Sequence, residues 1–416
     1  MTESETKGKK SKAPSTNAKA ARHTPIKAQN GWRLLRGILW RTIAVVAASS
    51  IAIGSYAAVS LTGEIKTAGL NLLDSNGQSR VTPADLKGPI NMLLIGSDTR
   101  LGQGANFGNE TSVLADVIIL LHVSADRKNA VAMSFPRDTM VPWPECPDPN
   151  GGSPYLAQSL GQINATIANG GPGCTLLTVE KLTGLKIPYL AMIDFKGVIE
   201  MSNAIGGVEV CVANDIKDPY THTNLKAGKH VLLGKQALQF LRTRHGIGDG
   251  SDLSRISNQQ VYMTSLVRKI KDQGVLSNPA YLYSLASAAA RNMKLSSNLT
   301  DLNVMVGLAQ SLKNVDLKNI SFIMLPSRTG LPAPYQGRVA PVYEKANKVF
   351  ELLRKDKPIV LTGNHTGVGV TVTKPKPGSS SSPSPSSTAT SKPLTQSSGL
   401  DGVVGSSGAT TTCSNG

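Results

Sequence analysis

An α/β fold with one central sheet is the architecture that this 416-residue sequence predicts. Three short apolar runs, at 89–98, 116–123 and 129–138, are nearly continuous and rich in β-branched residues, which is typical of strands in a sheet interior. Farther along the chain, apolar runs alternate with segments of helical periodicity. Because that alternation places helices on both faces of a sheet, we expect three layers, α/β/α, around a mostly continuous sheet.

Each element after the third strand is predicted from its own pattern. Residues 158–169 and 175–184 have helical periodicity, and Gly184 marks the end of the second helix. In chain order, the later expected elements are a strand at 187–195, a helix at 196–206, a strand at 206–212, helices at 234–243 and 254–273, a helical region to about 314, a strand at 319–326 and a closing helix at 343–356.

The N-terminal part of the chain differs in composition from the middle. Residues 1–41 hold ten Lys or Arg against two Glu, and residues 42–61 follow as twenty positions without a charge. At about 1.5 Å per helical residue, such a stretch crosses the roughly 30 Å hydrocarbon layer, so 42–61 is predicted to be an uncleaved transmembrane helix. The positive-inside rule then places the basic arm 1–41 in the cytoplasm. The chain that follows the membrane span is expected outside the cell membrane, beginning with an extracellular linker at 62–88.

Residues 361–416 are rich in Ser, Thr, Pro and Gly, a composition that cannot bury a core, and they are predicted to be a disordered tail. Cys146 and Cys174 flank a Pro- and Gly-rich loop, and an external compartment permits a disulfide between them. Cys211 is expected to be a small buried residue on a strand. Cys413, in the tail, has no obvious partner.

The net charge of +17 does not by itself indicate a protein that binds nucleic acid. Nearly half of the excess, +8, belongs to residues 1–41, so no nucleic-acid partner is expected. The sequence contains neither a Gly-x-x-x-x-Gly-Lys-Ser/Thr loop nor a Gly-x-Ser-x-Gly motif, which excludes P-loop and α/β-hydrolase chemistry.

Charged residues recur where the first three predicted strands begin or end. Asp98 and Arg100 follow the first strand, Asp116 opens the second, and Arg137 and Asp138 follow the third. Single residues of this kind are as readily turn residues, helix caps or surface ion pairs. Their recurrence favours a ligand site, because ligands of α/β proteins bind at strand ends.

A second group of polar residues surrounds a glycine hinge in LRTRHGIGDGSDLSRISNQQ: Arg242, Arg244, Asp252, Arg255 and Gln259. The first two fall in the last turn of a predicted helix, where cations also stabilise the helix dipole. Asp252 is expected to cap the next helix, on which Arg255 and Gln259 share one face. Because arginine binds phosphate oxygens through paired N–H groups and carboxylates hold hard cations, these residues and the strand ends predict a pyrophosphate–magnesium site.

Five sequence motifs resemble the LCP (LytR–CpsA–Psr) cell-wall glycopolymer ligases, and most closely their actinobacterial members. They are GSDTR, SFPRDTMV, INATIANGGPGCTLLTVEKLTG, DFKGVIEMSNAIGGVEV and ALQFLRTRHGIGDGSDLSRISNQQ, in family-like order. The resemblance implies a membrane-anchored, extracellular phosphotransferase with a three-layer LCP-like catalytic domain at 89–360. Such an enzyme passes the glycosyl-phosphate end of a polyprenyl-pyrophosphate-linked glycopolymer to a peptidoglycan hydroxyl and releases polyprenyl phosphate.

The resemblance also implies roles for the charged residues. Asp98 and Asp116 would hold Mg²⁺ (or Mn²⁺). Asp138 and Asp252 would aim the arginines, and either of them would serve as the base for the acceptor hydroxyl. The residues implied to grip the pyrophosphate or to orient its neighbours are Arg100, Arg137, Arg242, Arg244, Arg255 and Gln259.

Leu114 and Asn258 depart from the family pattern, because arginine usually stands at both positions. Both losses thin the cationic cluster, so we expect the rate or the donor preference to differ. Three other functions are open from sequence alone: a hydrolase that replaces the acceptor with water, a transcriptional regulator or attenuator of the envelope, and a wall-binding structural protein whose arginines only hold anionic polymer. The expected external location argues against the regulator.

Overall fold

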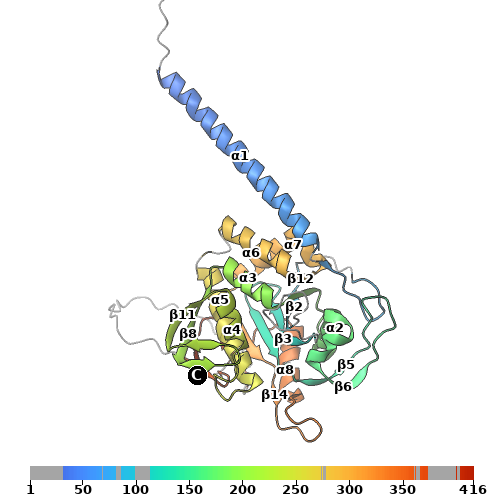
Figure 1. The fold of residues 1–416 in the computed structure, drawn as a ribbon. Coiled ribbons are helices and arrows are strands. Elements are labelled where there is room, and N and C mark those ends of the chain that lie inside the picture. The colour runs from blue at the N-terminus through green and yellow to red at the C-terminus, as the bar shows by residue number, and fades with distance from the viewer. Residues whose placement is uncertain are drawn as a thin grey trace, which may run out of the picture. The chain divides into compact units, whose positions relative to one another are not determined.

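The computed structural model describes residues 31–67, 69–80, 86–98, 113–272, 274, 278–359, 361, 366–372, 400 and 403–416 (Figure 1). The chain divides into two compact units, Met1–Ala57 and Ala58–Gly416. The predicted membrane span 42–61 is helical, within α1 (Gly31–Thr67). No helix among the described residues is long and apolar enough to cross a membrane, and several side chains of 50–61 lie outside the described set. The transmembrane helix stays a prediction.

The core of the second unit is a mixed eight-stranded sheet with the order β1-β12-β7-β2-β3-β4-β13-β17. Its middle strands β2 (Ile90–Ser97), β3 (Ala115–Val123) and β4 (Ala130–Phe135) form an antiparallel meander, which confirms the first three predicted strands. β7 (Tyr189–Ile193) pairs parallel with β2, and β13 (Ile320–Met324) pairs parallel with β4. The outer strands are β1 (Gly69–Leu70), β12 (Met293–Ser296) and β17 (Gly405–Ser407).

Side chains of the middle strands alternate between two buried faces, as the pleat of a strand requires. In β2, Leu93 and Ile95 belong to the core on one face, whereas Ile90 and Leu94 pack into the core on the other. Because both faces are apolar, these strands are nearly continuous apolar runs in the sequence.

Helices cover both faces of the sheet, which confirms the three-layer prediction. α2 (Gly171–Thr183), α8 (Tyr343–Arg354) and the 3₁₀ helix η2 (Ile163–Asn169) supply buried apolar side chains to one face. α5 (Asp252–Asp272) and α7 (Leu302–Asn314) supply side chains to the other. The remaining long helices, which pack against each other, are α3 (Phe195–Ala204) and α6 (Pro279–Asn292).

A smaller four-stranded sheet with the order β11-β8-β18-β16 has an apolar core of its own. β8 (Val208–Asn214) confirms the strand predicted at 206–212, although it lies in this sheet and not in the central one. α4 (Gly234–Arg242) and α5 pack against it. The other strands outside the central sheet are β9 (Ile216–Asp218), β10 (Thr223–Leu225), β11 (Gly228–Leu232), β14 (Ser327–Arg328), β15 (Ala340–Pro341), β16 (Val370–Val372) and β18 (Thr412–Asn415).

Two helical predictions are wrong in part. The first half of the helix predicted at 158–169 is strand β6 (Gln158–Gln162), which pairs with β5 (Met140–Trp143). Strand β12 interrupts the helical region predicted to about 314, because it pairs with β7. In both places, pairing with a strand distant in sequence outweighs a weak local preference for helix.

The predicted disorder of the tail is wrong for residues 370–372 and 403–416. β16 and β18 join the smaller sheet, and β17 pairs with β13 at the edge of the central sheet. Cys211 lies on a strand as expected, but it is half-buried and is bonded to Cys413, for which the sequence offered no obvious partner. Residues 373–399 lie outside the described residues. The predicted disulfide between Cys146 and Cys174 is confirmed.

Candidate active site

Three strand ends meet at one edge of the central sheet. Because β2, β3 and β4 are antiparallel neighbours, the end of β2, the start of β3 and the end of β4 lie on the same side. Asp98 follows β2, Asp116 is the second residue of β3, and Arg137 and Asp138 follow β4. The β2–β3 register shifts at Ser97 and leaves Asp116 out of the regular ladder. The fold thus brings four of the predicted site residues to one edge.

The segment between α4 and α5 forms the second part of the site. α4 ends at Arg242, and Gly248 then has a positive φ of 50°, a conformation that favours glycine. The buried carboxylate of Asp218 accepts hydrogen bonds from the backbone N–H groups of Arg244 and His245 at 3.0 and 3.2 Å. These bonds fix the start of the hinge.

Helix α5 begins at Asp252, but Asp252 is not its cap. Ser251 takes that role, because its Oγ accepts a hydrogen bond from the backbone N–H of Ser254 at 3.2 Å. The predicted capping role of Asp252 is therefore wrong, and its carboxylate is directed toward arginines instead.

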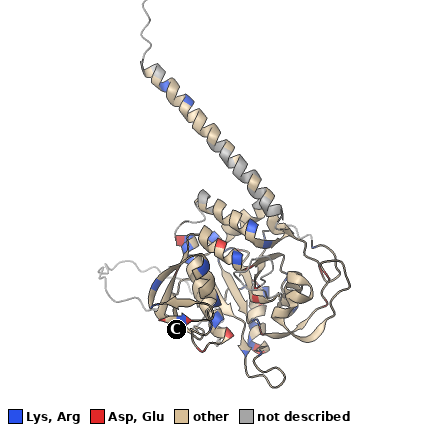
Figure 2. Ribbon diagram, in the orientation of Figure 1, with Lys and Arg blue, Asp and Glu red and all other residues tan. Residues whose placement is uncertain are grey.

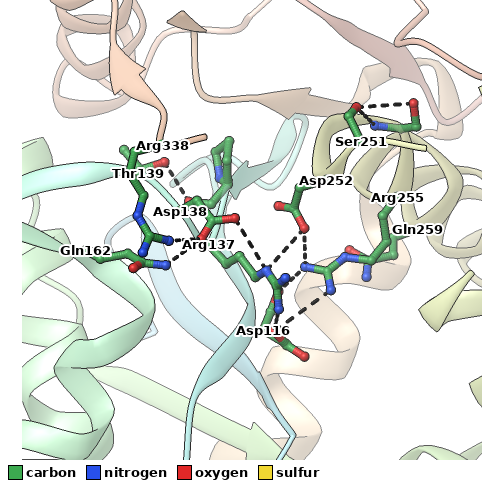
Figure 3. A network of polar contacts seen from close by, with 12 residues as sticks. Asp116, Arg137, Asp138, Thr139, Gln162, Ser251, Asp252, Arg255, Gln259 and Arg338 are labelled. Atoms are coloured by element: carbon green, nitrogen blue, oxygen red, sulfur yellow. Dashed lines mark hydrogen bonds and ion pairs between the residues drawn. The ribbon is translucent and has the colours of Figure 1, made fainter. Parts of the chain in front are cut away.

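Arg137 lies at the centre of an ion-pair network (Figure 3). Its Nη1 donates to Asp116 Oδ1 at 2.5 Å, and its Nε lies 3.3 Å from Asp252 Oδ1 and 3.6 Å from Asp138 Oδ2. Arg255 contacts two of the same residues. Its Nη2 lies 2.7 Å from Asp252 Oδ1 and donates to the backbone oxygen of Asp116 at 3.0 Å. The carboxylate of Asp252 therefore joins the strand ends to α5.

Asp138 has two further partners that the sequence did not indicate. Arg338 Nη1 and Gln162 Nε2 donate to Asp138 Oδ1 at 2.9 and 2.5 Å. Gln162 is the last residue of β6, and Arg338 lies in the loop before β15. No motif or spacing links either residue to Asp138, so only the fold reveals them.

Charges of both signs are interspersed over the described elements of residues 58–416 (Figure 2).

Within the ion-pair network, burial and neighbouring charges shift the pKa values of the side chains. Asp252 is 8% exposed, and burial raises its pKa despite the opposing charges of Arg255 and Arg137. Burial also lowers the pKa of Arg255, which is 5% exposed. For Arg137, burial opposes the charge, but the nearby carboxylates, Asp116 foremost, raise its pKa overall. Both arginines remain charged at neutral pH.

Two guanidinium groups keep a buried Nε–H without a hydrogen-bond acceptor among the described residues, those of Arg244 and Arg255. The Nε of Arg137 also makes no hydrogen bond there, but it faces the carboxylates of Asp252 and Asp138. The charge of Arg244 influences the pKa values of both Asp252 and Arg255, so Arg244 lies beside the network. Buried donors are normally satisfied, and unsatisfied ones at a charged site fit an anionic ligand such as a phosphate.

Three of the residues predicted to bind phosphate are not found in this network. Arg100 lies outside the described residues. The guanidinium of Arg242 lies over the ring of Phe195, 4.4 Å from its centroid. Gln259 Nε2 donates to the backbone oxygen of Leu241 at 3.1 Å, which satisfies a carbonyl in the last turn of α4. Contact between phosphate and these three residues stays a prediction.

Asp98, directly after β2, and Asp116, in β3, lie at the same edge of the central sheet. Asp98 Oδ1 accepts a hydrogen bond from the backbone N–H of Leu114 at 3.0 Å, and the Asp116 carboxylate meets both arginines through Oδ1. Within the described residues, no group of three or more His, Cys, Asp or Glu is placed to hold a metal. A pair of carboxylates nevertheless fits Mg²⁺, which commonly binds one or two carboxylates and fills its other positions with water and substrate phosphate.

Residues 56–355 match the LytR_cpsA_psr family. The chain belongs to this family. The cell wall biosynthesis protein LcpA of Corynebacterium glutamicum is 29% identical over 296 residues, which cover 65% of this chain and 56% of that protein. The probable cell wall biosynthesis protein LcpB of the same organism is 31% identical and covers 53% and 50%. The chain thus spans about half the length of these two relatives.

Other relatives and solved structures are covered over a larger share of their own length. The polyisoprenyl-teichoic acid–peptidoglycan teichoic acid transferase TagT of Bacillus subtilis is 29% identical over 65% of this chain and 80% of its own. A crystal structure from Streptococcus agalactiae has a TM-score of 0.55 at 21% identity and covers 67% of this chain and 91% of that one. TagV of B. subtilis has a TM-score of 0.51 at 22% identity and covers 65% and 97%. The solved structures confirm the fold of this family member.

Proposed function

We propose that this protein is a transferase that moves a glycopolymer from a polyprenyl-pyrophosphate carrier to a peptidoglycan hydroxyl and releases polyprenyl phosphate. The observation that carries the proposal is the buried network in which Asp252 joins Arg137 at the strand ends to Arg255 on α5. Membership of the LytR_cpsA_psr family supports it, because the relative TagT is named as a teichoic acid transferase.

Arg137, Arg244 and Arg255 bind the pyrophosphate in this proposal. A planar guanidinium matches a pair of phosphate oxygens, and Arg244 and Arg255 each have an Nε–H that no described residue accepts. Asp116 and Asp252 hold Arg137 and Arg255 in place, so the cationic surface is formed before the donor binds. Positioning and charge neutralisation supply most of the catalysis in phosphoryl transfer.

Asp98 and Asp116 are the residues that would hold Mg²⁺ or Mn²⁺. The hydrogen bond from Leu114 fixes Asp98 at the end of β2, and the contact with Arg137 fixes Asp116. Mg²⁺ commonly binds one or two carboxylates and takes its other ligands from water and substrate phosphates. When bound, the cation supplies positive charge to the phosphate oxygens.

Asp252 is the better candidate for the base that accepts the proton of the acceptor hydroxyl. Burial raises its pKa, which brings its proton affinity closer to that required at neutral pH. Its Oδ2 has no hydrogen-bond partner among the described residues. Asp138, by contrast, already accepts hydrogen bonds from Arg338 and Gln162, so its role is to orient Arg137.

The proposed location is the outer side of the cell membrane, with 42–61 as the anchor, 1–41 in the cytoplasm and no nucleic-acid partner. The disulfides Cys146–Cys174 and Cys211–Cys413 support this location. Disulfides persist in oxidising compartments and are rare in the cytosol.

A transfer assay tests the proposed function. The purified full chain is incubated with a synthetic lipid-pyrophosphate oligosaccharide, peptidoglycan fragments and Mg²⁺, and polyprenyl phosphate is measured. We expect release that depends on the acceptor and is lost in Arg244→Ala and in Asp98→Asn. Arg354→Ala is the matched control, because Arg354 donates to the backbone oxygen of Thr183 at the end of α2 and should leave transfer intact.

Two outcomes of this assay would change the assignment. Equal release with and without peptidoglycan would favour the hydrolase, in which water replaces the acceptor. Unchanged release in both Arg244→Ala and Asp98→Asn would contradict a site at the strand ends and the hinge.

A further inference from the structure

The C-terminal segment 403–416 is attached to the core beside the hinge that carries Arg244. β18 lies between β8 and β16, and its Cys413 is bonded to Cys211 of β8. The segment is also attached to α5, because Arg268 Nε donates to the backbone oxygen of Gly408 at 2.9 Å. A covalent bond and a charged side chain therefore hold it in place.

Ser414 and Asn258, both 0% exposed, link this segment to α4. Ser414 Oγ donates to Asn258 Oδ1 at 2.5 Å, and Asn258 Nδ2 donates to the backbone oxygen of Phe240 at 2.7 Å. Phe240 lies in the last turn of α4, and its backbone oxygen also accepts the N–H of the C-cap residue Thr243 at 3.3 Å. One side-chain amide thus connects the C-terminal strand to the helix end that precedes Arg244.

Gly248 forms a second link between the hinge and the C-terminal strands. Its N–H donates to the backbone oxygen of Asn415 at 3.2 Å, and Asn415 N–H donates to the backbone oxygen of Gly369 at 2.8 Å. A Cβ added to Gly248 would lie 3.0 Å from Gly369 Cα and 2.7 Å from Ser254 Oγ. The turn therefore rests directly on the backbone of residue 369.

We propose that Ser414 and Asn258 are positioning residues, through which the disulfide-anchored strand β18 holds the hinge so that Arg244 faces the pyrophosphate. The inference rests on the proposed function. A glycine-containing segment has little rigidity of its own, and a binding side chain needs neighbours that fix its backbone.

The chemistry of asparagine at position 258 supports this role. The Asn258 amide accepts from Ser414 and donates to Phe240 at the same time. An arginine at this position would carry donors and no acceptor, so it could not receive the Ser414 hydrogen bond.

Binding of inorganic pyrophosphate with Mg²⁺, measured by calorimetry on the full chain, tests the inference. Ser414→Ala leaves Asn258 Oδ1 without its donor, and we expect the Kd to rise about 3- to 10-fold. Ser407→Ala is the matched control, because that hydroxyl donates to the backbone oxygen of Lys318, away from the hinge, and should leave the Kd unchanged. Ser414→Ala combined with Asn258→Ala should bind no more weakly than Asn258→Ala alone, since both act through one connection.

Gly248→Ala tests the second link and leaves the buried hydrogen bonds from Ser414 to Asn258 and from Asn258 to Phe240 unaltered. The added Cβ pushes the turn away from Gly369, and we expect a similar rise in Kd. Gly250→Ala is the control for backbone strain, because Gly250 also has a positive φ, of 73°, but its Cβ would meet only Arg244 O and His245 Cα at 3.9 Å. The Kd of Gly250→Ala should rise less than that of Gly248→Ala.

The failure of this inference and the failure of the proposed function give different results. If Arg244→Ala loses pyrophosphate binding while Ser414→Ala and Gly248→Ala bind like the wild type, the positioning role is wrong and the anion site stands. If Arg244→Ala binds as tightly as the wild type, the anion site itself is wrong. If Ser414→Ala has no folded state by thermal unfolding, the comparison of Gly248→Ala with Gly250→Ala decides.

Discussion

The two halves of the proposed site are held in place by different means. Asp116 and Arg137 lie at the ends of strands whose ladder continues through β2, β3 and β4. Arg244 lies on a hinge whose position depends on side chains from elsewhere, Asp218 and Asn258 among them. The sheet is a rigid support for the first half, whereas the second half is only as rigid as its distant contacts. Substitutions should therefore affect the two halves differently.

Removing Arg137, the central cation at the strand ends, should have the largest effect. Arg137→Ala takes away a phosphate ligand and leaves Asp116 and Asp252 with Arg255 as their shared cationic partner among the described residues. We expect kcat/KM for transfer to fall by about 10³-fold or more. Arg137→Lys should recover only part of this loss, because a point charge cannot bind two oxygens side by side. A loss of less than about 10-fold in Arg137→Ala would contradict the role given to it.

The carboxylate that joins the halves should control the pH dependence. Transfer needs the ionised form of Asp252, so the rate should fall as the pH drops through a pKa that burial raises above its ordinary value of 3.8. The transfer rate of Asp252→Asn should be about 10²-fold lower at neutral pH and should not fall further through this pKa as the pH drops. An unchanged fall in rate at low pH in the variant would assign the titration to another group.

The two disulfides should differ in their effect on the half of the site that carries Arg244. In the chain-entropy view, each contributes about 3–5 kcal/mol to stability, so replacing both cysteines of either pair by serine should lower the Tm. Only Cys211→Ser with Cys413→Ser releases β18, so this variant should also weaken Mg²⁺–pyrophosphate binding by about 10-fold. Equal affinities in the two double variants would show that the hinge does not depend on β18.

The smallest effect is expected at the start of the hinge. Burial tends to raise the pKa of Asp218, but backbone N–H donors, including that of Arg244, lower it overall. A lowered pKa in the folded state gives stability that is complete above the unfolded value and is lost as the pH falls through the folded value. Asp218→Asn should therefore cost about 1 kcal/mol at pH 7. Urea unfolding near pH 3 should show a smaller difference, and a constant difference would contradict this role.

The strand-end half was predictable because its signal is local. Apolar runs end at charged residues, and the antiparallel order of three consecutive strands brings Asp98, Asp116 and Arg137 to one edge. The contacts of the second half are not local. Cys211 and Cys413 are 202 residues apart, and Ser414 reaches Asn258 across 156 residues. Contacts over such distances follow from the complete fold and not from spacing.

Composition also misled the prediction for the C-terminus. The Ser-, Thr- and Gly-rich sequence cannot build a core alone, but a few buried side chains, such as Val403 and Cys413, are enough when existing sheet edges accept the strands. Similarly, Asp252 was correctly placed at the start of a helix, but capping by the adjacent Ser251 frees its carboxylate for the arginines.

A double-mutant cycle between Arg137→Ala and Arg244→Ala tests most directly whether the two halves bind one pyrophosphate. The measurement is kcat/KM for acceptor-dependent release of polyprenyl phosphate by the wild type, the two single variants and the double variant. Residues that act on the same group as a unit have non-additive effects, so the double variant should lose little more than the worse single variant. Losses that multiply, or a wild-type rate in either single variant, would show that the strand ends and the hinge do not form one site.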